Sequence, residues 1–232
     1  RTMAIPEGIE MEDLGKIVDW SKKLTLAEHQ FNHKEIKQIS EDFASGILKC
    51  AQLIEKEINA HVSGQVSEGT FKKIERPFRI IAGFREIPKT SSDLHPIYWN
   101  TFQTIVLRLE DSNRNAQFLI QNIFDKHTKE DSENLKKYLE NLETAKWIDE
   151  FATPKVWNNV STKIKEKLST YVANLHTSLG KIRLSENYQW LEELILIRSK
   201  INALEPLKEI AGLGETSKEI SEQVDEQINE IL

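Results

Sequence analysis

The amino-acid sequence predicts an all-α protein. Apolar residues recur at intervals of three and four along most of the chain, most prolines fall between the predicted helices or at their first positions, and no alternating pattern is long enough for a sheet. We therefore expect an elongated bundle, or a stack of antiparallel helical hairpins, with one irregular segment near residues 63–95.

The composition is typical of a globular protein. Of the 232 residues, 39% are hydrophobic and 29% are charged, with nine glycines and six prolines, which excludes the collagen-like, mucin-like and strongly disordered classes. A chain of this length can form a core that needs neither metal nor disulfide. We expect one helical domain over residues 1–232, or a fragment of a larger protein. A subdivision into 1–95 and 96–232 stays open.

Two helices are predicted before residue 63. The first covers residues 10–20 and the second covers 26–62, where Thr25 and Glu28 have the spacing of a capping box. Gly46 is the expected position of a bend in the second helix. Its apolar stripe comprises Ile36, Ile39, Phe43, Ile47, Cys50, Ile54, Ile58 and Val62.

The segment 63–88 does not fit the helical pattern as well. It contains five glycine or proline residues, and either a short hairpin or a broken helix is compatible with it. Residues 70–89 also combine six cations and two acids with Phe71, Phe78 and Phe84. This basic segment predicts a contact with anionic lipid, RNA or an acidic protein through Lys72, Lys73, Arg76, Arg79 and Arg85. Alternatively, its phenylalanines fill the core while its cations remain in solvent.

Residues 154–180 form the best-defined helix of the rest of the chain. Thr153 is the expected N-cap, Pro154 fits the first position and Gly180 can end the helix. Its apolar stripe comprises Val156, Val160, Ile164, Leu168, Val172, Leu175 and Leu179. Further helices are expected at 96–110, 113–127, 131–151, 185–204 and 216–232, with caps at Asn113, Asp131, Ser185 and Thr216.

The net charge of −6 resides in residues 205–232, the acidic tail, because the first 204 residues hold 29 basic and 29 acidic side chains. No helix has the run of cations expected of a nucleic-acid-binding face, so we expect no sequence-specific nucleic acid as a partner. The tail predicts an amphipathic helix that packs on another protein or on another part of the same polypeptide, such as the cationic residues 155–183. Its expected contact residues are Ile220, Val224 and Ile228, with the acids Glu222, Asp225 and Glu226.

Residues typical of catalysis are scattered. His29 and His33 lie four apart and could share a metal ion on one helix, but no third ligand is identifiable, and surface placement is the favoured interpretation. Cys50 is interpreted as a small buried hydrophobe. The five tryptophans are interpreted as packing anchors at helix junctions: Trp20, Trp99, Trp147, Trp157 and Trp190. We expect no catalytic residue, no metal site and no cofactor.

These observations predict a non-enzymatic helical protein–protein interaction module, either a scaffold or tether subunit or part of a larger multidomain protein. The alternative is a peripheral membrane or anion-binding module that uses the basic segment, and a metal-dependent helical enzyme is a third class. No apolar stretch approaches the roughly 18 residues that span a bilayer. The single cysteine excludes an internal disulfide and favours a reducing compartment, so we expect a cytoplasmic location.

Overall fold

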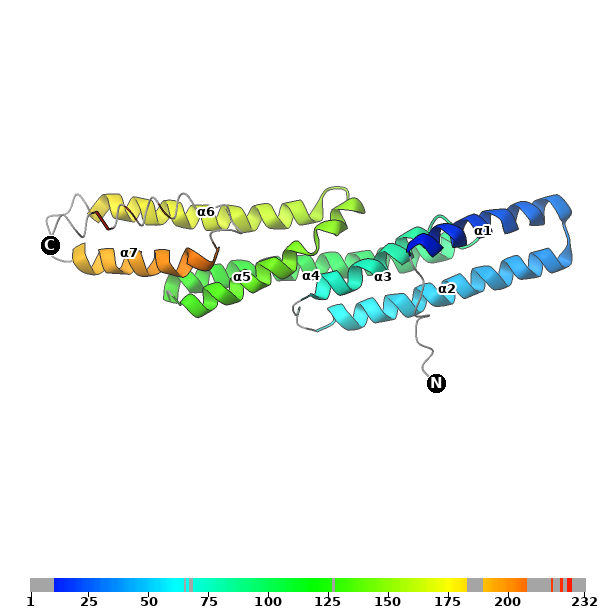
Figure 1. Ribbon diagram of the computed structural model, residues 1–232, viewed down its shortest axis with the longest axis horizontal. Coiled ribbons are helices and arrows are strands. Elements are labelled where there is room, and N and C mark those ends of the chain that lie inside the picture. The colour runs from blue at the N-terminus through cyan, green and yellow to red at the C-terminus, as the bar shows by residue number, and fades with distance from the viewer. Residues whose placement is uncertain are drawn as a thin grey trace. The chain divides into compact units, whose positions relative to one another are not determined.

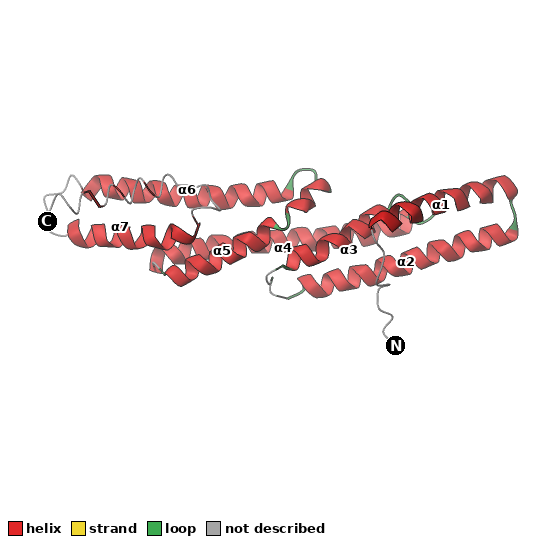
Figure 2. Ribbon diagram, viewed as in Figure 1, coloured by secondary structure: helices red, strands yellow, loops and turns green. Residues whose placement is uncertain are grey.

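The computed structural model describes residues 11–64, 66, 69–126, 128–182 and 190–207, together with 218, 222, 225 and 226. Within these residues the chain forms helices joined by short loops and contains no strand (Figure 2). The predicted all-α class is therefore confirmed. The chain divides into two compact units, residues 1–108 and 109–232, and the boundary falls inside one helix, α4 (Ser91–Lys126).

Unit 1 begins with an antiparallel helical hairpin, in which α1 (Met11–Phe31) runs alongside α2 (Lys34–Val62) (Figure 1). The turn between them is at Asn32, which has a positive φ of 42°, a conformation that asparagine tolerates better than most residues. The predicted helices 10–20 and 26–62 are therefore wrong in their bounds. Thr25 does not cap a helix, because it lies inside α1 and donates its hydroxyl to the Ser21 carbonyl at 3.0 Å.

The predicted irregular segment is mostly helical. It contains α3 (Thr70–Phe84) and the beginning of α4, so the broken-helix alternative is correct and the hairpin is not. Gly69 precedes α3 in a left-handed conformation with φ of 73°. Glycine adopts this conformation without a steric penalty, which explains why a glycine stands at this position. Pro77 lies within α3, which continues through it because a fully buried stripe holds the helix in the core: Phe71, Ile74, Phe78, Ile81 and Phe84.

Unit 2 contains the second part of α4, followed by α5 (Lys129–Glu143), the short 3₁₀ helix η1 (Lys146–Glu150), α6 (Val156–Ile182), α7 (Trp190–Leu204) and η2 (Glu205–Leu207). Helix α6 packs against η1 and α7, and α5 packs against α7 and η2 (Figure 1). The predicted stripe of α6 is confirmed from Val160 to Leu179, where all six residues are buried.

Several predicted ends in this part of the chain are wrong. The helices 96–110 and 113–127 are one helix, α4, and Asn113 is inside it, where its side chain accepts a hydrogen bond from Gln117 at 3.1 Å. The helix 131–151 ends at Glu143. Gly180 lies inside α6 and does not end it. The predicted caps Ser185 and Thr216 lie outside the described residues.

The cap of α6 comes from a residue that the sequence pattern did not indicate. Asp149 of η1 accepts hydrogen bonds from the backbone N–H groups of Trp157, at 2.7 Å, and Asn158, at 3.2 Å. Thr153, the predicted cap, is exposed to solvent. An aspartate at this place satisfies two otherwise unpaired donors and places a negative charge at the positive end of the helix.

Candidate protein-interaction surfaces

Helix α1 has an inner face that attaches it to the rest of unit 1. Leu14 lies against Gly83 of α3, and Glu28, near the other end of α1, forms an ion pair with Lys89. Val18 and Ser21 lie on the same face and are buried. Because these positions recur at intervals of four, three and seven residues, they form one stripe along the helix.

A second apolar stripe runs along another side of α1. It comprises Ile17, Trp20, Leu24, Ala27 and Phe31, and we call it the α1 seam. The spacing of three, four, three and four residues is that of the a and d positions of two heptads. At 100° per residue the α1 seam lies roughly 95° from the inner face, and it is about 21 Å long.

The two aromatic residues of the α1 seam are largely in solvent. Trp20 is 62% exposed and Phe31 is 67% exposed, while Ile17, Leu24 and Ala27 are half-buried. Large aromatic side chains with this exposure are characteristic of surfaces that bind another molecule. The α1 seam therefore has the spacing of a helix-packing surface, with Trp20 and Phe31 in solvent and its other three residues partly covered within unit 1.

Charged residues beside the α1 seam form local pairs on α1 itself. Lys23 Nζ lies 2.7 Å from Asp19 Oδ2, and Lys16 Nζ lies 3.1 Å from Asp13 Oδ1. Exposed pairs of this kind stabilise a helix by about 0–1 kcal/mol. The seam is thus bordered by a polar margin of nearly balanced charge.

The aromatic residues of the basic segment do not form the exposed ligand-binding surface that the sequence suggests. Phe71, Phe78 and Phe84 are fully buried, and the ring of Phe78 lies 5.4 Å from that of Tyr98 in α4. None of these three rings can stack on a ligand at the surface. The alternative interpretation, in which the phenylalanines fill the core, matches these positions.

Arg79 and Arg85, which were expected to bind an anion, contact other side chains of unit 1. Arg79 Nε lies 3.0 Å from Glu75 Oε1, and the Arg85 guanidinium lies 4.1 Å above the ring of Tyr98. Lys72, Lys73 and Arg76 are exposed in the first two turns of α3. That end of the helix has no acidic residue in its first turn and no side-chain cap, so positive charge accumulates there.

The acidic tail is described at four positions, all of them helical, and the expected contact residues Ile220, Val224 and Ile228 lie outside the described residues. Asp225 Oδ1 lies 3.2 Å from Arg198 Nη2 of α7, and Glu222 pairs with Lys218 at 3.6 Å. Glu226 is exposed. At Asp225, the tail contacts α7 of the same chain.

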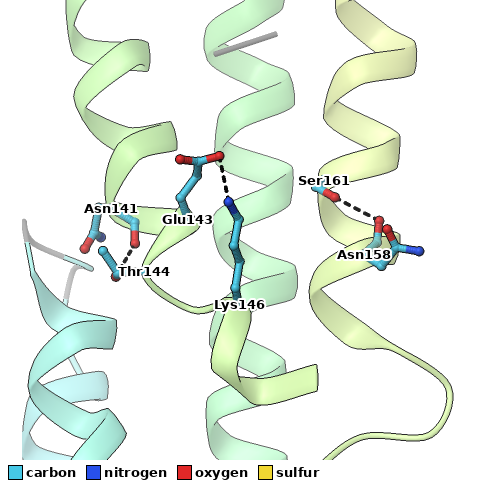
Figure 3. Close-up of polar contacts among 6 residues, drawn as sticks. All are labelled: Asn141, Glu143, Thr144, Lys146, Asn158 and Ser161. Atoms are coloured by element: carbon cyan, nitrogen blue, oxygen red, sulfur yellow. Dashed lines mark hydrogen bonds and ion pairs between the residues drawn. The ribbon is translucent and has the colours of Figure 1, made fainter. Parts of the chain in front are cut away.

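A small apolar hollow lies between α5 and α6 in unit 2. Leu139, Ile164 and Leu168 line it together with the half-buried ring of Trp157, and its volume is about 30 Å³, enough for about one water molecule. Figure 3 shows the polar contacts at this edge of the unit, in which Glu143 pairs with Lys146 at 3.2 Å. The hollow is a secondary candidate for contact with an apolar side chain.

The same close-up shows two local hydrogen bonds that hold the helix ends beside the hollow (Figure 3). The Thr144 hydroxyl donates to the Asn141 carbonyl at 2.6 Å, and the Ser161 hydroxyl donates to the Asn158 carbonyl at 3.0 Å. Both bonds connect residues three apart, one at the end of α5 and one in the first turn of α6. They support the local structure beside the hollow.

The turn of the hairpin separates the two histidines that lie four apart in the sequence. His29 is in the last turn of α1, whereas His33 is the N-cap of α2, so the two residues do not share a helix. Among the described residues there is no group of three side chains able to hold a metal ion. Cys50 is half-buried, and burial raises the pKa of its thiol, which disfavours the reactive thiolate.

The prediction that the tryptophans are packing anchors is correct for Trp147, which is 6% exposed, and wrong for Trp20 and Trp99. Sequence analysis missed the α1 seam because it ended the first helix at residue 20 and so divided the stripe. The spacing from Ile17 to Phe31 is visible in the sequence once the whole segment is written as one helix.

No protein-family model, no curated protein and no solved structure matches this chain significantly. Among the described helices, none combines the length and the apolar character required to cross a lipid bilayer.

Proposed function

We propose that this chain is a non-enzymatic helical protein–protein interaction module, a scaffold or tether subunit or part of a larger multidomain protein, which binds through the α1 seam. The observation that carries the proposal is the exposure of Trp20 and Phe31 on a stripe with heptad spacing. A helix laid along this stripe in a coiled-coil-like contact would remove both rings from water. Burying their exposed parts contributes about 1–2 kcal/mol each.

The single cysteine supports a reducing compartment, and a cytoplasmic location is part of the proposal. A helical unit attached by its inner face and apolar on a second face can connect two molecules without any chemistry of its own. The tail adds a further acidic surface at Glu222 and Glu226, which are exposed.

The test is a crosslinked capture from source-cell lysate with three baits. They are the native chain, the double variant Trp20→Ala/Phe31→Ala, and the control Leu107→Ala/Phe118→Ala, which removes two apolar side chains of similar exposure from α4. A protein captured in stoichiometric amount by the native and control chains, and lost with the seam variant, supports the proposal. Equal capture by all three baits, or none by any, contradicts it.

A fourth bait, ending at Leu204, separates the seam from the tail. The proposal expects this truncated chain to keep the seam-dependent protein. Loss of that protein on truncation would place the contact on the acidic tail and its predicted residues.

The second candidate is an anion-binding or peripheral membrane module. It is favoured by Lys72, Lys73 and Arg76, which are exposed in the first two turns of α3, where the first turn has no acidic residue. Changing all three to glutamate should abolish sedimentation with anionic liposomes, whereas changing Lys163 and Lys165, two exposed cations of α6, should not. This candidate fails if the native chain does not sediment or if the α3 variant sediments equally.

A further inference from the structure

We infer that the acidic tail packs on α7 of its own chain as an antiparallel helix, with Ile228 and Leu232 against an exposed apolar stripe of α7. The inference goes beyond the proposed function, because it concerns unit 2 and does not involve the α1 seam. It starts from the ion pair of 3.2 Å between Asp225 Oδ1 of the tail and Arg198 Nη2 of α7.

Helix α7 has an apolar stripe on the side that carries Arg198. Its inner face is buried in unit 2 and comprises Leu194, Ile197 and Ile201. Leu191 and Ile195 precede Arg198 at steps of four and three, and these three residues lie roughly 95° around the helix from the inner face. Leu191 is 43% exposed and Ile195 is 57% exposed. The arginine that contacts the tail therefore lies at the end of a stripe with two large apolar side chains in solvent.

The four described positions of the tail distinguish its sides. All four are helical, and Lys218, Glu222 and Glu226 are exposed, whereas Asp225 is half-buried. Steps of four place the three exposed residues on one side of a helix. The tail therefore has a charged solvent side, and Asp225 lies at the edge of that side, where it reaches α7.

The helical spacing places apolar residues of the tail beside its aspartate. Ile228 and Leu232 lie outside the described residues, and they follow Asp225 by three and seven positions, so they share its side of a continued helix. In an antiparallel pair whose register is set by the ion pair, Ile228 is level with Ile195. Leu232 is then level with Leu191. One ion pair and two apolar pairs thus form between two stripes of opposite order.

The length of the connection favours the antiparallel direction. In this register Lys218 is level with residue 205, beside the short helix η2, so residues 208–217 have only to reverse the chain. In a parallel pair Lys218 would instead be level with Leu191. The connection would then have to return along nearly the whole of α7, about 20 Å at 1.5 Å per residue.

The covalent connection allows a small contact to hold the tail. A short linker keeps the tail near α7 at an effective concentration on the order of millimolar, so the contact needs far less area than an interface between separate molecules. The exposed ion pair sets the register and contributes little to the affinity, which comes from the apolar residues. A docked tail leaves its acids as the outer surface, and another protein can reach the stripe of α7 only when the tail is displaced.

Thiol bridging tests the contact in the 232-residue chain with Cys50→Ser. The reagent is dibromobimane, which becomes fluorescent when it bridges two nearby thiols. Ile195→Cys/Ile228→Cys should bridge within one molecule at about 1 μM chain, and at least tenfold faster than the control Glu193→Cys/Ile228→Cys. Glu193 is also exposed on α7, roughly 160° around the helix from Ile195. Circular dichroism verifies that both variants are helical.

A third variant tests the direction of the tail. Ile195→Cys/Ser221→Cys brings its two thiols level only in a parallel pair, so it should bridge as slowly as the control. Faster bridging of this variant than of Ile195→Cys/Ile228→Cys would overturn the antiparallel register. Equal rates for Ile195→Cys/Ile228→Cys and its control, or a product that joins two molecules, would overturn docking of the tail on its own α7.

Exchange of the two charges tests the register. In the Ile195→Cys/Ile228→Cys chain, Arg198→Asp should slow bridging at least twofold, because two acids then face each other. Adding Asp225→Arg should restore the rate, since it re-forms the ion pair with the charges exchanged. A rate that Arg198→Asp leaves unchanged, or that the exchange does not restore, would refute this register.

Discussion

Leu14 occupies the space that a side chain at Gly83 would need. A Cβ atom built at Gly83 would collide with the Leu14 side chain, whose Cγ would lie 3.0 Å away. Helix α1 can therefore approach α3 closely at this point, and the contact fixes one end of the inner face of α1. It determines which side of α1 remains available to a partner.

The first prediction concerns this contact. Gly83→Ala should lower the free energy of unfolding by about 1–2 kcal/mol, because Leu14 must move within a packed core. Gly46→Ala is the matched control, since nothing lies within 4 Å of its Cβ position, and it should stabilise α2 by about 0.5–1 kcal/mol. Urea unfolding measures both. In a Leu14→Ala background the cost of Gly83→Ala should disappear, and an unchanged cost would refute the steric explanation.

The second prediction concerns pH. The hydrogen bond from Lys89 lowers the pKa of Glu28 below its ordinary value of 4.5, against the opposing effect of burial. A carboxyl group with a lowered pKa in the folded state stabilises the fold above its unfolded pKa, and this contribution is lost as the pH falls through the folded pKa. The native chain should therefore lose more stability than Glu28→Gln between about pH 5 and pH 3.

The control for this prediction is Glu35→Gln, which removes an exposed carboxylate from the first turn of α2. Urea midpoints measured at several pH values should follow the native chain for this variant. If Glu28→Gln shows the same pH dependence as the native chain, the pair with Lys89 does not contribute in the way proposed.

The third prediction concerns the cap of α6. Asp149→Ala should destabilise unit 2 by about 1–2 kcal/mol, because two backbone donors lose their acceptor. Thr153→Ala should change stability by less than about 0.5 kcal/mol, since the Thr153 side chain is exposed. Thermal unfolding followed by circular dichroism compares the two. If Thr153→Ala destabilised the chain more than Asp149→Ala, Thr153 would be the cap of α6, as the sequence suggested.

The fourth prediction concerns Cys50. Because burial raises the pKa of its thiol, Cys50 in the folded chain should react with Ellman's reagent at pH 8 at least about tenfold more slowly than in urea. A matched control is Ala60→Cys in a Cys50→Ser background, which places a thiol at an exposed position of the same helix. Equal rates at the two positions would exclude a protective environment around Cys50.

The sequence was sufficient for the fold class and for α6 because the stripe from Val160 to Leu179 is regular and long. It was insufficient at the turn between α1 and α2, where Asn32 reverses the chain without a glycine or proline, while Thr25 and Glu28 imitate a helix start. The sequence pattern also could not predict which residue caps α6. Asp149 lies eight residues before the first N–H that it accepts from, and only the path of η1 brings it there.

The sequence predicted the kind of candidate site, an amphipathic protein-binding surface, but it did not predict where in the chain that surface lies. An amphipathic surface was expected on the tail, whereas the largest exposed aromatic pair on one described helix is Trp20 and Phe31 of α1. In the basic segment, periodicity could not distinguish buried phenylalanines from exposed ones, because burial depends on α1, α2 and α4, which contribute from distant parts of the sequence. A second apolar stripe on one helix is the signal that would have indicated the α1 seam.

The most direct test of the central claim is fluorine NMR of the native 232-residue chain labelled with 5-fluorotryptophan, with the Trp20 resonance assigned by Trp20→Phe. If the α1 seam is the contact surface, the Trp20 resonance should shift or broaden as the captured partner is added. The resonance of Trp99, which is 48% exposed on α4, should not change. A Trp20 resonance that stays constant when the partner is added would contradict the proposed role of the α1 seam.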